Sequence, residues 1–432
     1  MRRISDMWNN RWDESERVLG AEVTSSLKKL YDFYGDNIYK WFARLYEPEI
    51  GGFYYSNSAR DYEGFLPDIE STTQVTEMVA GTGMVSHLGL NVTNMGHALP
   101  DDIRLSIMHF AQGLQDKEDG FFYHAQWGKN IGSSRKGRDI NSSIGVIRRM
   151  GGEPLYETAL EKLRRAPKTQ ETTNLSVPEY MTDRAKLAEY LSGLKVNYDS
   201  HGVGHTLESQ GSQLKATGLI DDVCDWLDSK QLDTGLWQPI TDRPYTALSG
   251  LLKIGSFYRI ADRQMKHCDS MVDAAIEVIL CDEDPIYVIL VYNPWGGLRY
   301  ALLNMKKANQ TAKEAGEPLP YDIDAVYEKI RARAPEMIAK TIEKLNKFRH
   351  PDGSFSYCQR VSASHTQGTH VSLGVEEGDV NGTALAMNTM SSTIFEVLGI
   401  SRVPLYSPDD FDTFIKLLRA QKSPQKKSVP TE

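Results

Sequence analysis

Acidic and amide side chains recur just before stretches that have the hydrophobic pattern of a helix. Six such segments begin at Pro67, Arg138, Thr206, Thr241, Tyr292 and Gly378. Asp, Asn, Ser and Thr side chains accept hydrogen bonds from the free amides of a first helical turn. The pattern therefore predicts six helix starts, whose polar residues are Asp68, Glu70, Asp139, Asn141, Glu208, Asp242, Asn293, Asp379 and Asn381.

Some of these side chains suit acid–base chemistry as well as helix capping. Asp68 lies two residues from Glu70, and Asp379 follows Glu376 and Glu377, which is a denser grouping than a cap needs. Paired carboxylates on opposite sides of a cavity are the acid and base of glycoside hydrolysis. The carboxylates that we consider catalytic candidates are Asp68, Glu70, Asp139, Glu208 and Asp379. For Asp242 and Asn293, capping is the preferred interpretation.

A second set of candidates gathers around a loop histidine. His124 follows Tyr123 and precedes Trp127, and Arg138 comes shortly before a predicted helix start. Together they offer a base, a phenol, an aromatic platform and a guanidinium that can bind a carboxylate. β-Elimination from a uronic acid needs these groups, because the carboxylate must be neutralised, a proton removed and the leaving oxygen protonated. We expect His124 and Tyr123 to be catalytic, and Trp127, Arg138 and Asn141 to contact the substrate.

Two further pairs of histidines are candidates for ligand contact. His201 and His205 lie just before Glu208, and His365 and His370 lie in a polar loop upstream of Asp379. Either pair could bind a divalent metal. Because neither spacing is an established metal signature, we assign no metal and no cofactor. Substrate contact is the role expected for His201, His205 and His365, and for Asn381 at its helix start.

Four loops combine glycine with aromatic residues, at 49–56, 118–124, 232–239 and 351–358. Each follows a helical pattern, and glycine permits the tight turn that such a connection needs. Any one of the rings packs more often into the core than onto a cavity rim. The rings that we nevertheless consider as substrate contacts, together with one from the helix start at Tyr292, are Tyr54, Tyr55, Trp237, Trp295 and Tyr357.

Helical periodicity dominates the chain, and strand-like alternation is sparse. Clear helical patterns cover 21–46, 267–281 and 324–349, and most of the six predicted starts have another helix before them. This repetition predicts an all-α (α/α)6 toroid with the Gly-aromatic loops at one mouth. We expect a single domain over 1–420, with a surface loop near 166–178 and a disordered basic tail over 421–432.

Composition limits the classes of function. The 432 residues are 40% hydrophobic and 25% charged, which is an ordinary globular balance. No stretch approaches the roughly 20 apolar residues that span a bilayer, and the net charge of −9 argues against a nucleic-acid partner. Four scattered cysteines and the lack of an apolar leader are typical of a reduced, cytoplasmic protein. Phosphate-loop, dinucleotide-binding and serine-hydrolase motifs are missing, and oligomeric state is left open.

Two segments resemble carbohydrate-active (α/α)6 barrels, namely unsaturated glycuronyl hydrolases and related polysaccharide lyases. They are QDKEDGFFYHAQW at 115–127 and QLDTGLWQPITDRPYTALSGLLKIGSF at 231–257. The resemblance implies an enzyme that cleaves a glycosidic bond in an acidic oligosaccharide. In the hydrolases an acid ends the first loop, whereas this chain has Gln126-Trp127-Gly128. We therefore prefer β-elimination over hydrolysis by paired carboxylates.

A weaker resemblance is to terpenoid cyclases. Gln231, Gly235 and Trp237 have the form of a Gln-Trp motif of that family, and the segment from Asp379 is placed like its acidic helix start. Asn381 stands where the family has its proton-donating acid. An isoprenoid-processing toroid is thus an alternative, and a non-catalytic sugar-binding toroid is another.

Overall fold

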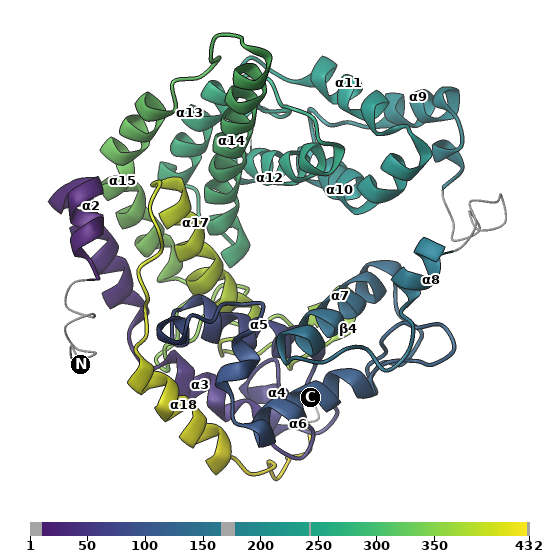
Figure 1. The fold of residues 1–432 in the computed structure, drawn as a ribbon, viewed down its shortest axis with the longest axis vertical. Coiled ribbons are helices and arrows are strands. Elements are labelled where there is room, and N and C mark those ends of the chain that lie inside the picture. The colour runs from purple at the N-terminus through teal and green to yellow at the C-terminus, as the bar shows by residue number, and fades with distance from the viewer. Residues whose placement is uncertain (1–10, 166–177, 242, 430–432) are drawn as a thin grey trace.

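The computed structural model describes residues 11–165, 178–241 and 243–429, and these residues are mostly helical (Figure 1). The named strands among them form two short antiparallel pairs, β1 (Tyr46–Glu47) with β2 (Gly52–Phe53) and β3 (His365–Thr366) with β4 (Thr369–His370). The predicted all-α class is therefore confirmed. Within the described ranges, no helix combines the length and the apolar character that a membrane span requires.

The α-helices are α2 (Asp13–Tyr34), α3 (Ile38–Arg44), α4 (Asn57–Asp61), α5 (Ile69–Gly81), α6 (Asp101–Gly113), α7 (Ser133–Arg149), α8 (Ala159–Arg165), α9 (Arg184–Gly193), α10 (Ser200–Thr217), α11 (Ile220–Lys230), α12 (Pro244–Ala261), α13 (Cys268–Leu280), α14 (Val288–Ala315), α15 (Ile323–Leu345), α16 (Val380–Thr383), α17 (Met390–Val397) and α18 (Pro408–Ala420). Short 3-10 turns are η1 (Ser86–Leu88), η2 (Met95–Ala98) and η4 (Glu179–Met181). A π-helical turn, η5 (Ala384–Thr389), joins α16 to α17.

Helices α10 and α12 pack closely and run in the same direction. Gly204 of α10 faces Ile254 of α12, and Gly211 faces Ile260, so the contact moves forward along both helices together. A Cβ atom at Gly204 would lie 2.9 Å from Cβ of Lys253, closer than side chains tolerate. Glycine on α10 is therefore what permits this close approach of two helix backbones.

The same relation holds between α12 and α14. Asn293 of α14 donates through Nδ2 to the Ser249 hydroxyl at 2.7 Å, and six residues further along α12 Gly255 faces Tyr300. The contacts again advance together, so α14 is parallel to α12. Asn293 is buried inside α14, not at its start, and its side-chain amide donates to a hydroxyl on the neighbouring helix α12.

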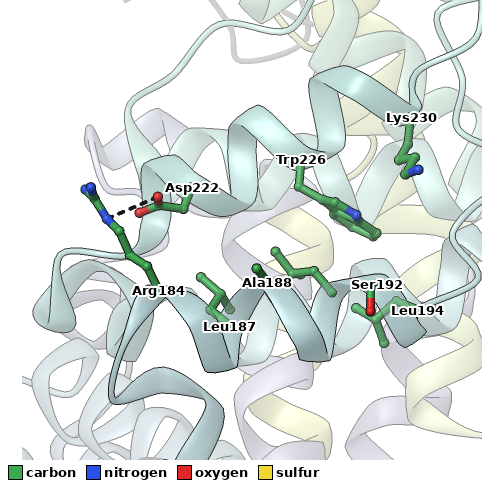
Figure 2. A pocket seen from close by; sticks show the side chains of 9 residues that line it. Arg184, Leu187, Ala188, Ser192, Leu194, Asp222, Trp226 and Lys230 are labelled. Atoms are coloured by element: carbon green, nitrogen blue, oxygen red, sulfur yellow. Dashed lines mark ion pairs between the residues drawn. The ribbon is translucent and has the colours of Figure 1, made fainter.

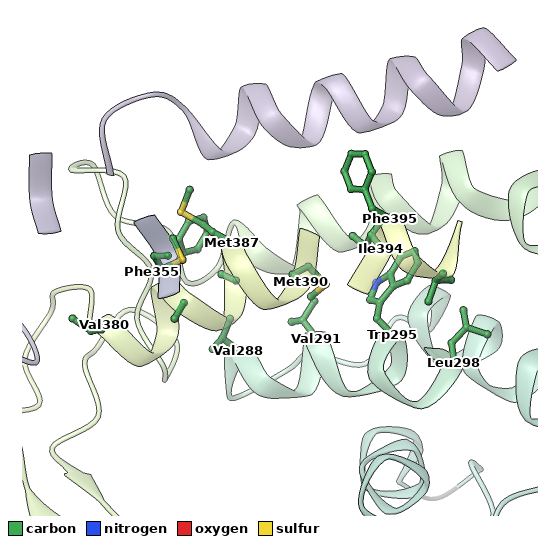
Figure 3. Packing of buried hydrophobic residues seen from close by; sticks show 14 of the residues in the cluster. Val288, Val291, Trp295, Leu298, Phe355, Val380, Met387, Met390, Ile394 and Phe395 are labelled. Carbon is green, nitrogen blue, oxygen red and sulfur yellow. The ribbon is translucent and has the colours of Figure 1, made fainter. Parts of the chain in front are cut away.

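The hydrophobic core between α14 and the η5–α17 segment shows a parallel course as well (Figure 3). Val288 and Val291 of α14 lie beside Met387 and Met390, and Trp295 lies beside Ile394 one turn later. All six side chains are buried, and burying one such side chain stabilises a fold by about 1.5–3 kcal/mol. The apolar spacing of three to four residues along α14 is what aligns this face.

Beyond η5 the series continues to α5 and α7. Gln74 of α5 donates to the Asn381 side chain at 2.9 Å, and seven residues on, Gly81 faces Asn388. On the other side of α5, salt bridges join Glu70 to Arg135 and Glu77 to Arg149. The second pair lies further along both helices than the first, so α5 and α7 are parallel. Figure 1 shows α10, α12, α14, α17, α5 and α7 following one another around the middle of the molecule, with α13, α15, α2 and α18 outside them.

Three of the six predicted helix starts are wrong. Asp139, Glu208 and Asn293 lie inside α7, α10 and α14, because those helices begin one to two turns earlier. The starts at Asp68 and Asp379 are confirmed, since each side chain accepts from a backbone amide of the first turn. For the remaining segment, α12 begins at Pro244, and Asp242 lies outside the described residues.

The expectation of a disordered tail is corrected over 421–429. The backbone of Lys427 donates to Asp61 and accepts from Glu63. The Lys426 ammonium donates to the carbonyl oxygens of Ala59 and Tyr62, both at 3.2 Å, and lies over the Tyr54 ring. Lys426 is thus held by carbonyl oxygens and an aromatic face that the sequence pattern does not reveal. Residues 430–432 of the predicted tail and residues 166–177 of the predicted loop near 166–178 lie outside the described ranges.

Candidate functional site

Because the neighbouring helices are parallel, their amino ends lie on one side of the molecule. We call this side the amino-terminal rim: the first two turns of α5, α7, α10, α12 and α14, the single turn of α16, and the residues just before them. Around α5, α7 and α16 the rim holds six ionisable groups, which we call the charge cluster. These groups are Asp68, Glu70, Arg135, Arg138, Asp139 and Asp379.

Glu70 and Arg135 form the centre of the charge cluster. Glu70 accepts from Nη1 of Arg135 at 3.0 Å and is also bonded to Arg138. Nη2 of Arg135 forms an ion pair with Asp139 at 2.7 Å, one helical turn further along α7. Arg135 is fully buried, whereas the side chain of Arg138 is 44% exposed. Arg138 is therefore the cation of this group that solvent and a ligand can reach.

Asp68 and Asp379 cap neighbouring helices and are both buried. Asp68 accepts from the amide and the hydroxyl of Ser71, and Asp379 accepts from the amides of Gly382, Tyr357 and Ala363. Burial raises the pKa of Asp68 to about 6, against the opposing influence of Arg135. Burial likewise raises the pKa of Asp379 to about 6, although its backbone hydrogen bonds act in the other direction.

Tyr55 lies beside these carboxylates. Burial, and then the charges of Asp379 and Glu70, hold the pKa of its phenol well above the ordinary value, so it is neutral. Its hydroxyl has no hydrogen bond of ordinary geometry among the described residues, although Asp379 lies close by. Tyr55 therefore adds a polar group to the cluster without adding charge to it.

His124 is enclosed rather than open to a substrate. Its Nε2 is 2.6 Å from the carbonyl oxygen of Pro67, and Nδ1 accepts from the Gln126 amide at 3.2 Å. The ring stacks on Trp127, with centroids 4.0 Å apart, and Trp127 in turn lies 5.0 Å from the Arg135 guanidinium. Burial lowers the pKa of His124 to about 4, which keeps it neutral. With both nitrogens engaged, the predicted role of His124 as a base is not supported by this geometry, and His124 and Trp127 instead support Arg135.

Tyr123 points away from the charge cluster. Its hydroxyl donates to Asp119 at 2.7 Å, and the ammonium groups of Lys129 and Lys136 lie over its ring. The pKa of this phenol is raised by burial and by Asp119. Tyr123 therefore contacts Asp119, Lys129 and Lys136, and its catalytic role stays a prediction without a contact to the charge cluster in its support.

The hairpin β3–β4 brings the second pair of histidines to the cluster. The Thr366 hydroxyl accepts from Nη1 of Arg135 at 3.0 Å, which fastens the hairpin to α7. His365 and His370 are paired across the hairpin, are exposed, and stack with centroids 4.9 Å apart. Burial and then the neighbouring His365 lower the pKa of His370. Sequence spacing alone did not connect these histidines with Arg135.

Tyr357 completes this half of the rim. Its amide donates to Asp379 at 2.8 Å, and its ring lies 5.6 Å from that of Tyr287, just before α14. Burial, Cys358 and Asp379 raise the pKa of the Tyr357 phenol to about 12, with Arg138 acting in the opposite direction. This half of the rim thus combines a half-buried phenol with the half-exposed guanidinium of Arg138.

The rim at α10 and α12 carries a more open set of groups. Tyr198 is 64% exposed, and Nη2 of Arg243 donates to its hydroxyl at 3.3 Å. His201 and His205 follow on α10 with ring centroids 6.4 Å apart. Burial and then Lys253 lower the pKa of His201. Further along α10, Glu208 forms a salt bridge of 2.6 Å with Lys253 of α12. This salt bridge links the two helices, and it is a structural alternative to the catalytic role predicted for Glu208.

Four aromatic residues expected at the rim belong to the core. The hydroxyl of Tyr54 donates to Glu47 at 3.0 Å, and Nε1 of Trp237 donates to the Leu227 carbonyl at 2.8 Å. Nε1 of Trp295 donates to Thr341 on α15 at 3.0 Å. These three side chains are buried, and their polar atoms are hydrogen-bonded inside the protein. Tyr55 is also buried, and its hydroxyl lies close to the carboxylate of Asp379. Asn141 is exposed on α7, and Asn381 holds Gln74 as described above.

One surface groove, of about 360 Å³, reaches the edge of this site, because Pro67 and His124 are among its lining residues. Another, of about 440 Å³, lies between α9 and α11 (Figure 2), and its lining includes Leu187, Leu191 and Trp226. An ion pair of 3.2 Å between Arg184 and Asp222 closes one end of it. As for metals, the described residues contain no group of three or more His, Cys, Asp or Glu side chains placed to hold an ion.

No protein-family model matches the chain, and neither curated proteins nor solved structures give a significant match.

Proposed function

We propose that the chain is an (α/α)6 toroid whose amino-terminal rim binds an acidic oligosaccharide and cleaves one of its glycosidic bonds. The parallel course of six neighbouring inner helices, with further helices outside them, supports the toroid. Parallel amino ends place six positive helix-dipole ends around one opening, which favours an anionic ligand.

The observation that carries the functional proposal is that the half-exposed guanidinium of Arg138 and the phenol of Tyr357 belong to the same half of the rim. Glu70 of α5 holds Arg138, and Tyr357 donates its amide to Asp379, which caps α16 against α5. Arg138 also opposes the rise in the pKa of the Tyr357 phenol. A guanidinium binds a carboxylate with two parallel hydrogen bonds. A uronate carboxylate on Arg138 would therefore bring its sugar ring against a neutral phenol.

We prefer β-elimination as the reaction. Arg138 neutralises the uronate carboxylate, a histidine of the β3–β4 hairpin removes the proton at C5, and the C4–O bond breaks. The electron pair of the C5–H bond forms the C4–C5 double bond, and the leaving oxygen takes a proton from Tyr357. The lowered pKa of His370 keeps its imidazole neutral near pH 7, which a proton acceptor needs. Tyr357 keeps its phenol proton near pH 7 because burial raises its pKa, so it has a proton to donate.

Hydrolysis by paired carboxylates fits this site less well. The oxygens of Asp68 and Asp379 accept hydrogen bonds from capped helices, and Glu70 is shared by two arginines. An isoprenoid substrate also fits less well, because the α10–α12 face carries the Glu208–Lys253 pair and α14 carries Arg299 paired with Glu396. Isoprenoid cavities are apolar, and bare charged pairs would be costly to desolvate there.

The test is incubation of the protein with uronate-containing oligosaccharides, with ultraviolet absorbance of an unsaturated uronate as the readout. Tyr357→Phe should lower kcat about 100-fold or more, as loss of a general acid does. Arg138→Ala should lower kcat/KM by a similar factor, whereas Arg148→Ala is the matched control, since Arg148 is exposed at the other end of α7. New reducing ends without the absorbance would indicate hydrolysis. Binding without any cleavage would indicate a sugar-binding protein, and would overturn the proposal.

A further inference from the structure

The half of the rim at α10 and α12 carries an arginine, Arg243, that forms no salt bridge with a carboxylate of the described residues; its neighbour Asp242 lies outside them. Arg243 precedes α12, and within the described ranges its guanidinium contacts Tyr198, at 5.2 Å from the ring centroid and 3.3 Å from the hydroxyl. By contrast, Arg135 and Arg138 each contact a carboxylate. An arginine left with a neutral partner keeps its donors available for an anion.

Tyr198 presents an exposed aromatic face beside Arg243. At 64% it is the most exposed large hydrophobic side chain of the described residues, and it stands directly before Asp199, the N-cap of α10. Exposed aromatic faces bind the apolar faces of ligand rings. The guanidinium on one side of the ring also limits its movement.

The start of α12 adds to the positive potential at this place. The helix is 18 residues long, its first residue is Pro244, and no side chain caps it. Its free amides and its dipole therefore point towards the rim. Together with Arg243 they form a site for a carboxylate, next to an aromatic platform for the ring that bears it.

We infer that Tyr198 and Arg243 form a second acidic-sugar subsite, in which Arg243 binds a carboxylate and Tyr198 stacks on the sugar ring. The subsite rests on the proposed function in one respect: its ligand is a further unit of the same acidic oligosaccharide that Arg138 binds. Since both places belong to the rim formed by parallel helices, a chain with acidic groups at more than one unit occupies them together. The subsite makes the protein selective for longer acidic chains.

The experiment measures binding of uronate oligosaccharides of increasing length by titration calorimetry, with the same chains carrying methyl-esterified carboxylates as neutral probes. Arg243→Ala should weaken binding of the longer acidic chains about tenfold, or about 1.4 kcal/mol, and leave the disaccharide unaffected. Tyr198→Ala should do the same, and Tyr198→Phe should retain most of the affinity. Arg259→Ala is the matched control, because Arg259 is exposed in the last turn of the same helix. Equal melting temperatures would show that the variants fold.

The outcomes separate this inference from the proposed function. If the parent cleaves uronate chains but Arg243→Ala and Arg259→Ala bind every length alike, the subsite is wrong and the enzyme proposal stands. If Arg243→Ala selectively weakens long chains although nothing is cleaved, the subsite stands and the enzymatic proposal fails. If Arg243→Ala weakens acidic and esterified chains equally, the carboxylate role is overturned. If the parent binds no uronate chain, both are overturned.

Discussion

The two halves of the amino-terminal rim carry the same kinds of side chain in opposite environments. Around α5, α7 and α16 the carboxylates and Arg135 are buried and bonded to one another. Around α10 and α12, Tyr198 is exposed, and Arg243 donates a hydrogen bond to its phenol oxygen. Buried charges must be paired to persist, whereas exposed charges are free to bind a ligand. The difference separates groups that build the rim from groups that can use it.

The largest effect should come from removing the buried cation. Arg135→Met leaves Asp139 buried without its partner and Glu70 with Arg138 alone, and should lower the free energy of unfolding by about 3–5 kcal/mol. Lys253→Met makes the same change of charge on the other half of the rim, where both partners are about a quarter exposed, and should cost no more than about 1 kcal/mol. Urea unfolding measures both. Equal losses in the two variants would remove the distinction between the halves.

The pH dependence of stability should also arise from the buried half. The pKa of Asp68 is about 6 in the folded protein and about 3.9 in an unfolded chain. Between pH 4 and 6 the folded state therefore binds more protons, and the free energy of unfolding falls as pH rises through this window. The fall reaches about 3 kcal/mol for one such group at pH 7.

Urea unfolding from pH 4 to 7.5 measures this fall in the parent, in Asp68→Asn and in Asp412→Asn. The asparagine at position 68 still accepts from the first turn of α5 but does not titrate, so its curve should be flatter. Asp412 is exposed on α18, and its variant should follow the parent. Parallel curves for all three proteins would contradict the raised pKa of Asp68.

The smallest effect concerns the backbone around Asp379. A Cβ atom at Gly382 would lie 2.5 Å from the carbonyl carbon of Ser356 and 2.6 Å from the Tyr357 nitrogen. Gly382→Ala should therefore cost about 1–3 kcal/mol, as overpacking does, and should displace Tyr357. Gly145→Ala is the control, since α7 has open space there and alanine favours a helix. Thermal unfolding that ranks Gly382→Ala at or above the parent would contradict the close approach.

Local sequence signals predicted the helical class and the two caps at Asp68 and Asp379, because capping depends on residues only three positions apart. The same signal failed at Asp139 and Glu208, where a polar residue before an apolar run lies inside a longer helix. Their carboxylates bond to Arg135 and Lys253 instead. A sequence window cannot distinguish a cap from a salt bridge, because the two place the same residue types at the same spacing.

The sequence predicted individual residues of the candidate site but not how they are arranged. His124 and Tyr357 were both singled out, yet their roles differ because His124 is closed in by Pro67 and Trp127, whereas Tyr357 is half-buried on the same half of the rim as Arg138. His365 was expected to contact substrate, but its nearness to Arg135 depends on a hydrogen bond that Arg135 donates to Thr366, 231 positions away in the chain. Such a contact leaves no local pattern.

What the sequence by itself determined is the supply of groups: helices with periodic apolar faces, glycines at their contacts, and acids, arginines and aromatics near their starts. Only the tertiary structure decided which of these groups are buried in pairs and which remain open. Burial is a property of neighbours brought together by the packing of α5, α7 and α16 on one side and of α10 and α12 on the other. An identical carboxylate is a structural anchor when it is dehydrated and bonded, and a binding group when it is not, and that balance is set in three dimensions.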